Sequence, residues 1–195
     1  MSYIYSTLIG EYDNPPIDRN VITKYPKNIK NLSDRRKSRF YKINSHLVSS
    51  RETIYLDSCL RLTNNPMPKI ESDIAVFHHP KRNCIYDEAE ICKELKLGNA
   101  QQIDEQISRY REEDFPEDFG LGENCYIIRK NNSKVMEFNE LWWKEYLRGS
   151  ERDQLSFIYC IWRTGISFEF IKGNPRQNNL YKNWGSHLRN RKKQE

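Results

Sequence analysis

The stretch Thr53–Leu56 (TIYL), followed by Asp57-Ser58-Cys59 and then by Leu60–Leu62, is the strongest strand signal in this chain of 195 residues. β-Branched and aromatic residues favour an extended strand, and a run without charged positions is typical of a strand buried on both faces. Asp57 is therefore expected where a central strand ends. A carboxylate there can hold a divalent metal, although a helix cap or a turn is an equally ordinary role for it.

Other short apolar runs predict the remaining strands. The runs are Tyr3–Leu8, Asn20–Lys24, Asp73–Phe77 and Cys125–Arg129. Stretches with helical signals alternate with them, namely Lys37–Leu47, Tyr86–Leu95, Ala100–Arg111, Asn139–Leu147 and Glu151–Trp162, the last with Ser150 as the expected N-cap. The alternation predicts an α/β fold with a central mixed, mainly parallel sheet flanked by helices. Without repeats or a linker, we expect one domain over residues 1–195, ending in a basic tail at about 188–195.

Composition narrows the class of protein. The formal net charge of +5 and the pI of about 8.9 suit a partner that carries phosphate. The five Cys form no CxxC pair, so neither disulfides nor zinc are indicated, and a cytoplasmic location is expected, in a host cell if the protein is viral. No apolar run approaches the roughly 20 residues that cross a bilayer, so no transmembrane segment is expected. The P-loop, dinucleotide, zinc-protease and serine-hydrolase motifs are all lacking.

Basic residues concentrate at Asp34–Lys42 (DRRKSRFYK) and at Arg189–Lys193. The first cluster is expected to open a helix, whose first turns could meet phosphate. Both clusters also suit a nucleic-acid-binding module, which is the rival function. The acids between Asp104 and Asp118 dilute any continuous basic face and argue against that rival.

Several charged side chains are candidates for a site. Arg39 and Lys42 lie three apart on one helix face, where they could receive a nucleotide phosphate or simply be solvated. His79–Arg82 groups a titratable ring with cations in one loop, although a structural histidine is the more ordinary role. Asp153 follows Ser-Glu-Arg at a helix start, where it would orient an acceptor hydroxyl or cap the helix. His187 could complete a metal site by folding back across a nucleotide.

The ordered segments YSTLIGEYDNP, RFYKINSH, TIYLDS, DIAVFHHPKRNCIYDEAE, FGLGENCYIIRK and SERDQLSFIY span roughly Tyr3 to Gly165. Together they resemble the glycosyltransferase-like family that includes plant proteins linked to seed mucilage and turgor. HPKRNCIYDEA and SERDQLSF are the most specific parts of the resemblance. It implies a single-domain GT-A-like fold, that of nucleotide-diphospho-sugar transferases, with one divalent metal, Mn²⁺ or Mg²⁺. It further implies a UDP-sugar donor and a glycan or glycoprotein acceptor.

Resemblance and residue patterns together assign the expected site by role. The donor nucleotide is expected at Thr7, Gly10, Tyr12, Asp13, Arg39 and Lys42, and the metal at Asp57 and His187. The expected catalytic residues are Asp153, Arg152 and Glu123, and those on the sugar or acceptor side are His79, Arg82 and Gln154.

In the expected reaction, the metal and two cations, Arg39 and Lys42, neutralise the departing diphosphate. Retention is favoured, with the leaving phosphate taking the acceptor proton, whereas in an inverting reaction Asp153 would be the base. Cys59 stands where related transferases have the second acid of a metal motif. An alternative function is therefore that of a catalytically idle family member, which binds a nucleotide sugar without transferring it. The protein is expected to be a monomer or weak dimer and not to bind nucleic acid.

Overall fold

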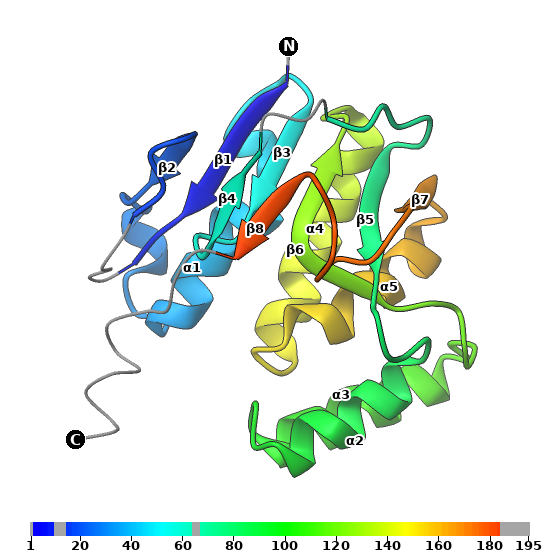
Figure 1. The fold of residues 1–195 in the computed structure, drawn as a ribbon. Helices are drawn as coiled ribbons and strands as arrows, with labels where there is room; N and C mark the ends of the chain where they lie inside the picture. The colour runs from blue at the N-terminus through cyan, green and yellow to red at the C-terminus, as the bar shows by residue number, and fades with distance from the viewer. Residues whose placement is uncertain (1, 10–14, 64–66, 184–195) are drawn as a thin grey trace, which may run out of the picture.

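The computed structural model describes residues 2–9, 15–63 and 67–183 (Figure 1). Its strands are β1 (Tyr3–Thr7), β2 (Asn20–Ile22), β3 (Thr53–Leu56), β4 (Leu60–Leu62), β5 (Ile74–His78), β6 (Gly122–Arg129), β7 (Phe168–Ile171) and β8 (Tyr181–Asn183). Its helices are α1 (Asp34–Ile43), α2 (Ile85–Glu94), α3 (Ala100–Glu112), α4 (Ser133–Arg148) and α5 (Asp153–Thr164), with short 3₁₀ helices η1 (Lys27–Ile29) and η2 (Ser45–Leu47). Among the residues described, no helix is both long and apolar enough to span a bilayer.

The central sheet has the strand order β2-β1-β3-β6-β5-β7. β1 pairs in parallel with β2 and β3, and β5 pairs in parallel with β7, whereas β6 runs antiparallel to both of its neighbours. The predicted α/β fold with a mixed, mostly parallel sheet is thus confirmed. β4 and β8 form a separate two-stranded antiparallel sheet.

A hydrophobic core lies on each face of the central sheet, because successive side chains of a strand point to opposite faces. On one face Tyr55 and Ile127 belong to the core that the helices cover. On the other face Ile54 and Leu56 pack with Tyr181 of β8 and with β4. Figure 1 shows β4 and β8 in front of the sheet and α4 behind it. All four residues of β3 are buried, as expected for the strand at the centre of the molecule.

One edge of the sheet gathers the chain segments that carry the predicted site. The carboxyl ends of the parallel strands β1, β3 and β5 lie at this edge, and the start of β6 joins them because β6 is antiparallel. Thr7 ends β1, Asp57 follows β3, His79 follows β5 and Glu123 lies at the start of β6. Open α/β sheets bind ligands at this kind of edge, outside the carboxyl ends of their strands.

The start of α5 differs from the prediction. The helix begins at Asp153 with Arg152 in the N-cap position, and no side chain caps it. Ser150, the predicted N-cap, instead directs its backbone N–H and its hydroxyl to the side-chain oxygen of Gln106 on α3. Because the Gln106 side chain is buried, its amide requires a partner, and this long-range contact takes the serine away from local capping.

The first turns of α1 are occupied by contacts within the protein. Ser33 caps the helix, and the guanidinium of Arg36 donates to the carbonyls of Leu147 and Gly149. The same guanidinium lies 3.4 Å from Glu151. The residues of α1 that reach the carboxyl edge of the sheet lie in its later turns, and the predicted contact of its first turns with phosphate stays a prediction.

Candidate active site

Lys42 lies at the centre of a buried cluster of charges. Its side chain is 2% exposed, and its Nζ lies 2.8 Å from Asp153 Oδ2 and 3.5 Å from Asp57 Oδ1. Arg39, one turn earlier on α1, places its Nε 3.5 Å from the other carboxylate oxygen of Asp153. Two cations from α1 thus face two carboxylates, one at the end of β3 and one at the start of α5. The formal charges of the four groups balance, which lets Lys42 and Asp153 be buried while Arg39 and Asp57 stay partly exposed.

Two acids at this edge of the sheet have opposite proton affinities. Burial alone would raise the pKa of Asp153, but the charges of Lys42 and Arg39 outweigh burial and hold that pKa well below its usual range. Burial raises the pKa of Glu123, and the negative charge of Asp57 raises it further. A carboxylate with a low pKa is a weak base, whereas a raised pKa suits proton transfer near neutral pH. The arrangement therefore favours Asp153 as a fixed charge and Glu123 as the titratable group.

Two side chains that the sequence analysis did not select hold Asp57 in place. The Tyr55 hydroxyl donates to Asp57 Oδ1 over 2.8 Å and lies 3.4 Å from the hydroxyl of Thr7. The guanidinium of Arg19 donates to the backbone carbonyls of Asp57 and Leu60, at 3.2 and 2.7 Å. Tyr55 could have been found, because it lies two residues before Asp57 and so on the same side of the strand. The sequence around Arg19 does not indicate its contact with Asp57.

Arg129, at the end of β6, fixes the end of α1. Its side chain is fully buried and donates to the carbonyls of Lys42 and Ile43, to the Tyr5 hydroxyl and to the side-chain oxygen of Asn139. The last carbonyls of a helix lack partners within the helix, and Arg129 supplies them. It therefore helps to set the position of Lys42. Its only sequence signal is a charged residue at the end of an apolar run.

The residues predicted on the sugar or acceptor side form a second network. Arg82 donates to Glu88 Oε2 over 2.5 Å, and the other oxygen of this buried carboxylate lies 3.7 Å from Arg152. Arg152 donates to the side chain of Gln154, which donates in turn to the carbonyl of Gly122. Glu88 thus joins the HPKR loop (His79–Arg82) to the SERDQ segment (Ser150–Gln154), two motifs that are distant in sequence. In the sequence, Glu88 is the acid that follows this loop at the start of the next helix, but no role at the site was expected for it.

His79 lies between the two networks. Its ring is buried, its Nδ1 accepts the backbone N–H of Arg82 over 3.1 Å, and its Nε2 lies 3.8 Å from Glu123. Burial lowers the pKa of His79 to about 4, and the charges of Arg82 and Arg176 add to this effect against that of Glu88. A neutral imidazole that accepts at Nδ1 carries its hydrogen at Nε2, so the N–H faces the Glu123 carboxyl.

Asn in place of His79 is expected to flatten the dependence of stability on pH between 6.5 and about 4. In this window the unfolded chain, with the ordinary pKa of 6.5, binds more protons than the folded protein, so the native free energy of unfolding falls as the pH falls. Above pH 6.5 the contribution is fully present. Asn offers an acceptor to the backbone N–H of Arg82 but does not titrate. Urea unfolding inside and above the window measures the difference, with His78→Asn as the control. Equal pH slopes for His79→Asn and the native protein would contradict the assignment.

Asp57 fits a divalent metal as one ligand of a site that the described side chains alone do not complete. Its side chain is 30% exposed, so the carboxylate can reach a ligand from solvent. Within residues 2–9, 15–63 and 67–183, no group of three or more His, Cys, Asp and Glu side chains is arranged to hold a metal ion. Burial, and then the charge of Asp57, raise the pKa of Cys59 to about 11, so its thiol stays protonated and is a poor ligand for a hard cation. Among the described residues no further side chain completes such a site, so diphosphate and water oxygens would supply ligands there, and the predicted ligand His187 lies outside those residues.

Four of the predicted site residues, Gly10, Tyr12, Asp13 and His187, lie outside the described residues, so their roles stay predictions. The other predicted residues all belong to the two networks above or, in the case of Thr7, contact them through Tyr55. Six separate segments of chain, from β1 to α5, therefore contribute to one region of the surface.

A family model described as "TOD1/MUCI70, glycosyltransferase-like domain" matches residues 21–183. The matched stretch contains α1, the end of β3, the HPKR loop, the start of β6 and the SERDQ segment. No curated protein and no solved structure matches the chain.

Proposed function

Because the chain belongs to the TOD1/MUCI70 glycosyltransferase-like family, we propose that it transfers a hexose or related sugar from a UDP-sugar to a glycan or glycoprotein acceptor. A glycosyltransferase-type function follows from the family. The observation that supports the finer statement is the convergence of Asp57, Lys42, Asp153, Glu123 and His79 at one edge of the sheet. These side chains combine what a diphosphate leaving group requires, cations and a metal-binding carboxylate, with a titratable carboxyl.

We assign the diphosphate to the region between Asp57 and Lys42. A divalent ion bound at Asp57 would act as a Lewis acid on the diphosphate oxygens. Lys42 and Arg39 would add positive charge to the same region, and Asp153 holds both cations in place. Tyr55 orients the Asp57 carboxylate by donating to one of its oxygens, which leaves the other oxygen to face the ligand.

Retention of configuration is part of the proposal. An inverting reaction needs a protein base for the acceptor hydroxyl, and Asp153 is unsuited because its two cations depress its basicity. In a retaining reaction the leaving phosphate takes the proton of the acceptor hydroxyl. Asp153 then does not need to accept a proton and can remain a fixed negative charge. Glu123, with its raised pKa and with His79 beside it, is then placed to hold the sugar.

A second candidate is a family member that binds a nucleotide sugar without turning it over. It is supported by the thiol of Cys59, which replaces a second carboxylate and stays protonated. Binding and turnover are separated by measuring both, since an idle member would retain metal-dependent UDP binding and hydrolyse no UDP-sugar.

UDP together with Mn²⁺ is expected to stabilise the protein, by about 2.7 kcal/mol when the ligand is at 100 times its Kd. Either component alone is expected to give much less, and a chelator is expected to reverse the effect. Thermal shift measures the stabilisation, and a panel of UDP-sugars screened for metal-dependent hydrolysis identifies the donor. The absence of any UDP–Mn²⁺ stabilisation would overturn the donor assignment.

A further inference from the structure

Two series of contacts begin at Glu88, and both end at Glu123. Glu88 lies in the first turn of α2, and its side chain is only 3% exposed. One of its carboxylate oxygens accepts from Arg82 over 2.5 Å, and the other lies 3.7 Å from Arg152. Each arginine starts one of the two series, and Glu88 is the group that they share.

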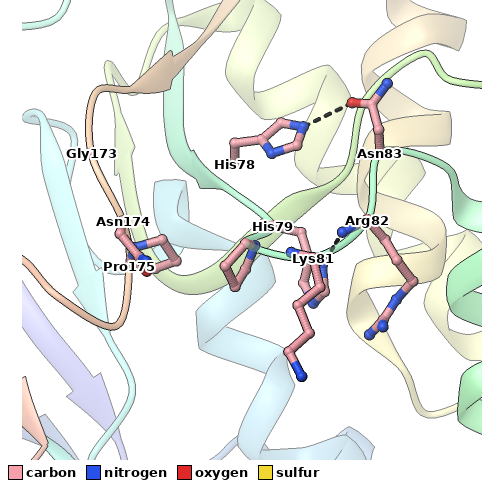
Figure 2. A pocket seen from close by; sticks show the side chains of 9 residues that line it. His78, His79, Lys81, Arg82, Asn83, Gly173, Asn174 and Pro175 are labelled. Atoms are coloured by element: carbon pink, nitrogen blue, oxygen red, sulfur yellow. Dashed lines mark hydrogen bonds between the residues drawn. The ribbon is translucent and has the colours of Figure 1, made fainter.

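The first series passes through the HPKR loop, which Figure 2 shows. The backbone N–H of His79 donates to the carbonyl of Leu121 over 2.7 Å, so the backbone is fixed at this point. The backbone N–H of Arg82 helps to set the direction of the imidazole ring by donating to Nδ1 over 3.1 Å. The other ring nitrogen then lies 3.8 Å from Glu123. Because Glu88 holds the side chain of Arg82, it helps to hold the ring that faces Glu123.

The second series passes through the SERDQ segment. Arg152 donates to the side chain of Gln154 over 2.8 Å, and Gln154 donates to the backbone carbonyl of Gly122 over 3.3 Å. Gly122 directly precedes Glu123 at the start of β6. This series therefore fixes the backbone that carries the Glu123 side chain, whereas the first series fixes the ring beside that side chain.

The sheet by itself fixes Glu123 incompletely, because the pairing of β5 with β6 is irregular next to it. Val76 pairs with Ile127, whereas the next residue of β5, Phe77, pairs with Glu123. Between these two pairs β6 has three residues, 124–126, and β5 has none. Irregularities of this kind re-aim side chains and interrupt the ladder of hydrogen bonds. The direction of Glu123 therefore depends on contacts outside the ladder.

A local role in its own helix does not account for the position of Glu88. Acids in the first turn of a helix are favoured by the helix dipole, and Asp87 shares that turn. Asp87 is exposed, however, whereas Glu88 is buried between two arginines. Removing a carboxylate from water is costly unless its partners compensate. The burial of Glu88 is therefore explained by the contacts that it makes with the HPKR loop and the SERDQ segment.

We propose that Glu88 is a positioning residue for sugar transfer, which holds the Glu123 carboxyl in place by fixing the ring of His79 and the backbone at Gly122. The inference rests on the proposed function, in which Glu123 holds the sugar. Glu88 acts through its two arginines and does not itself contact the sugar.

The first test compares NMR spectra of ¹⁵N-histidine-labelled native protein and Glu88→Gln, both without ligands. In the native protein Nδ1 of His79 accepts a hydrogen bond, so Nε2 carries the hydrogen. Gln keeps the shape of Glu88 but removes the charge that holds both arginines, so we expect the variant to lose this fixed tautomer. Asp87→Asn is the matched control, because it removes a carboxylate from the same turn of α2 and should leave the spectrum of His79 unchanged. Unchanged His79 signals in Glu88→Gln would overturn the proposal.

The second test measures turnover of the UDP-sugar that the hydrolysis screen identifies. Glu88→Gln is expected to lower kcat by about 10²-fold, the cost of a misplacement of about 1 Å. Its UDP–Mn²⁺ stabilisation is expected to stay, because Asp57 and Lys42 belong to neither series of contacts. Glu88→Asp keeps the charge and is expected to recover part of the loss.

The outcomes separate this proposal from a structural role and from the proposed function. A merely structural role of Glu88 would reduce kcat and UDP–Mn²⁺ stabilisation together, and that result would overturn the proposal, as would a native kcat in Glu88→Gln. A native protein that turned over no UDP-sugar would instead contradict the proposed function. The NMR comparison would then still decide whether Glu88 fixes His79, because it requires no ligand.

Discussion

Replacing Asp153 with Asn is expected to destabilise the protein by about 3–5 kcal/mol, the usual cost of removing one partner from a buried ion pair. Asp153 is buried and faces Lys42 Nζ at 2.8 Å and Arg39 Nε at 3.5 Å. Asn preserves the shape but leaves the buried ammonium of Lys42 with the more distant Asp57 as its remaining ion-pair partner among the described residues. Urea unfolding of both proteins at neutral pH measures the loss. UDP–Mn²⁺ stabilisation should weaken in parallel, because Lys42 loses its fixed position.

Asp34→Asn is the matched control for this prediction. Asp34 also faces a lysine of α1, Lys37 at 3.6 Å, but its side chain is 45% exposed, so the expected change is below about 1 kcal/mol. The pH dependence gives a second check. The folded pKa of Asp153 is depressed, so its contribution is present above the unfolded value of 3.8 and is lost as the pH falls toward the folded pKa. A gap between native protein and Asp153→Asn that stays constant below pH 3.8 would refute the ion-pair account.

Replacing Asp57 with Asn is expected to lower sugar transfer by about 10²–10³-fold, the range found when one electrostatic contact to a developing charge is removed. Asn can still accept the hydrogen bond from Tyr55, and the side chain is partly exposed, so folding should be nearly unchanged. The diagnostic measurement is thermal shift, in which the metal-dependent part of UDP stabilisation should disappear. The metal-independent part, which depends on Lys42 and Arg39, should remain.

Asp73→Asn is the control for the change at Asp57. Asp73 precedes β5 and therefore lies at the opposite edge of the sheet, where it accepts from Asn132 and Ser167. Its substitution should leave transfer and UDP–Mn²⁺ stabilisation intact. If Asp57→Asn kept the full manganese-dependent stabilisation, the metal would have to bind elsewhere. The assignment of the diphosphate to this end of β3 would then be wrong.

Much of the site was predictable because its residues sit at positions with strong local signals. Asp57 follows the most strongly predicted strand, and His79 and Arg82 follow another. Arg39 and Lys42 share a helix face through their spacing of three. Local pattern and family resemblance pointed to the same residues in these cases, and the structure places them within two adjoining networks.

The residues that support the site were not predictable, because their contacts cross long stretches of sequence. Arg19 bonds the backbone of Asp57 and Leu60, and Arg129 bonds the end of α1 from β6. Each looks like an ordinary charged residue in its own segment. The start of α5 was misplaced for the same reason, since Ser150 is drawn to Gln106 on a helix far away in the chain.

The fold class, the central strand and the charged residues available for chemistry can all be derived from the amino-acid sequence, because they follow from side-chain periodicity and from strand and helix ends. The pairing of those charges depends on the folded structure. It placed two α1 cations against Asp153 and left Glu123 with a raised pKa. The physical reason is that pKa and affinity depend on distance and burial, and both are set by segments that meet only after the chain has folded.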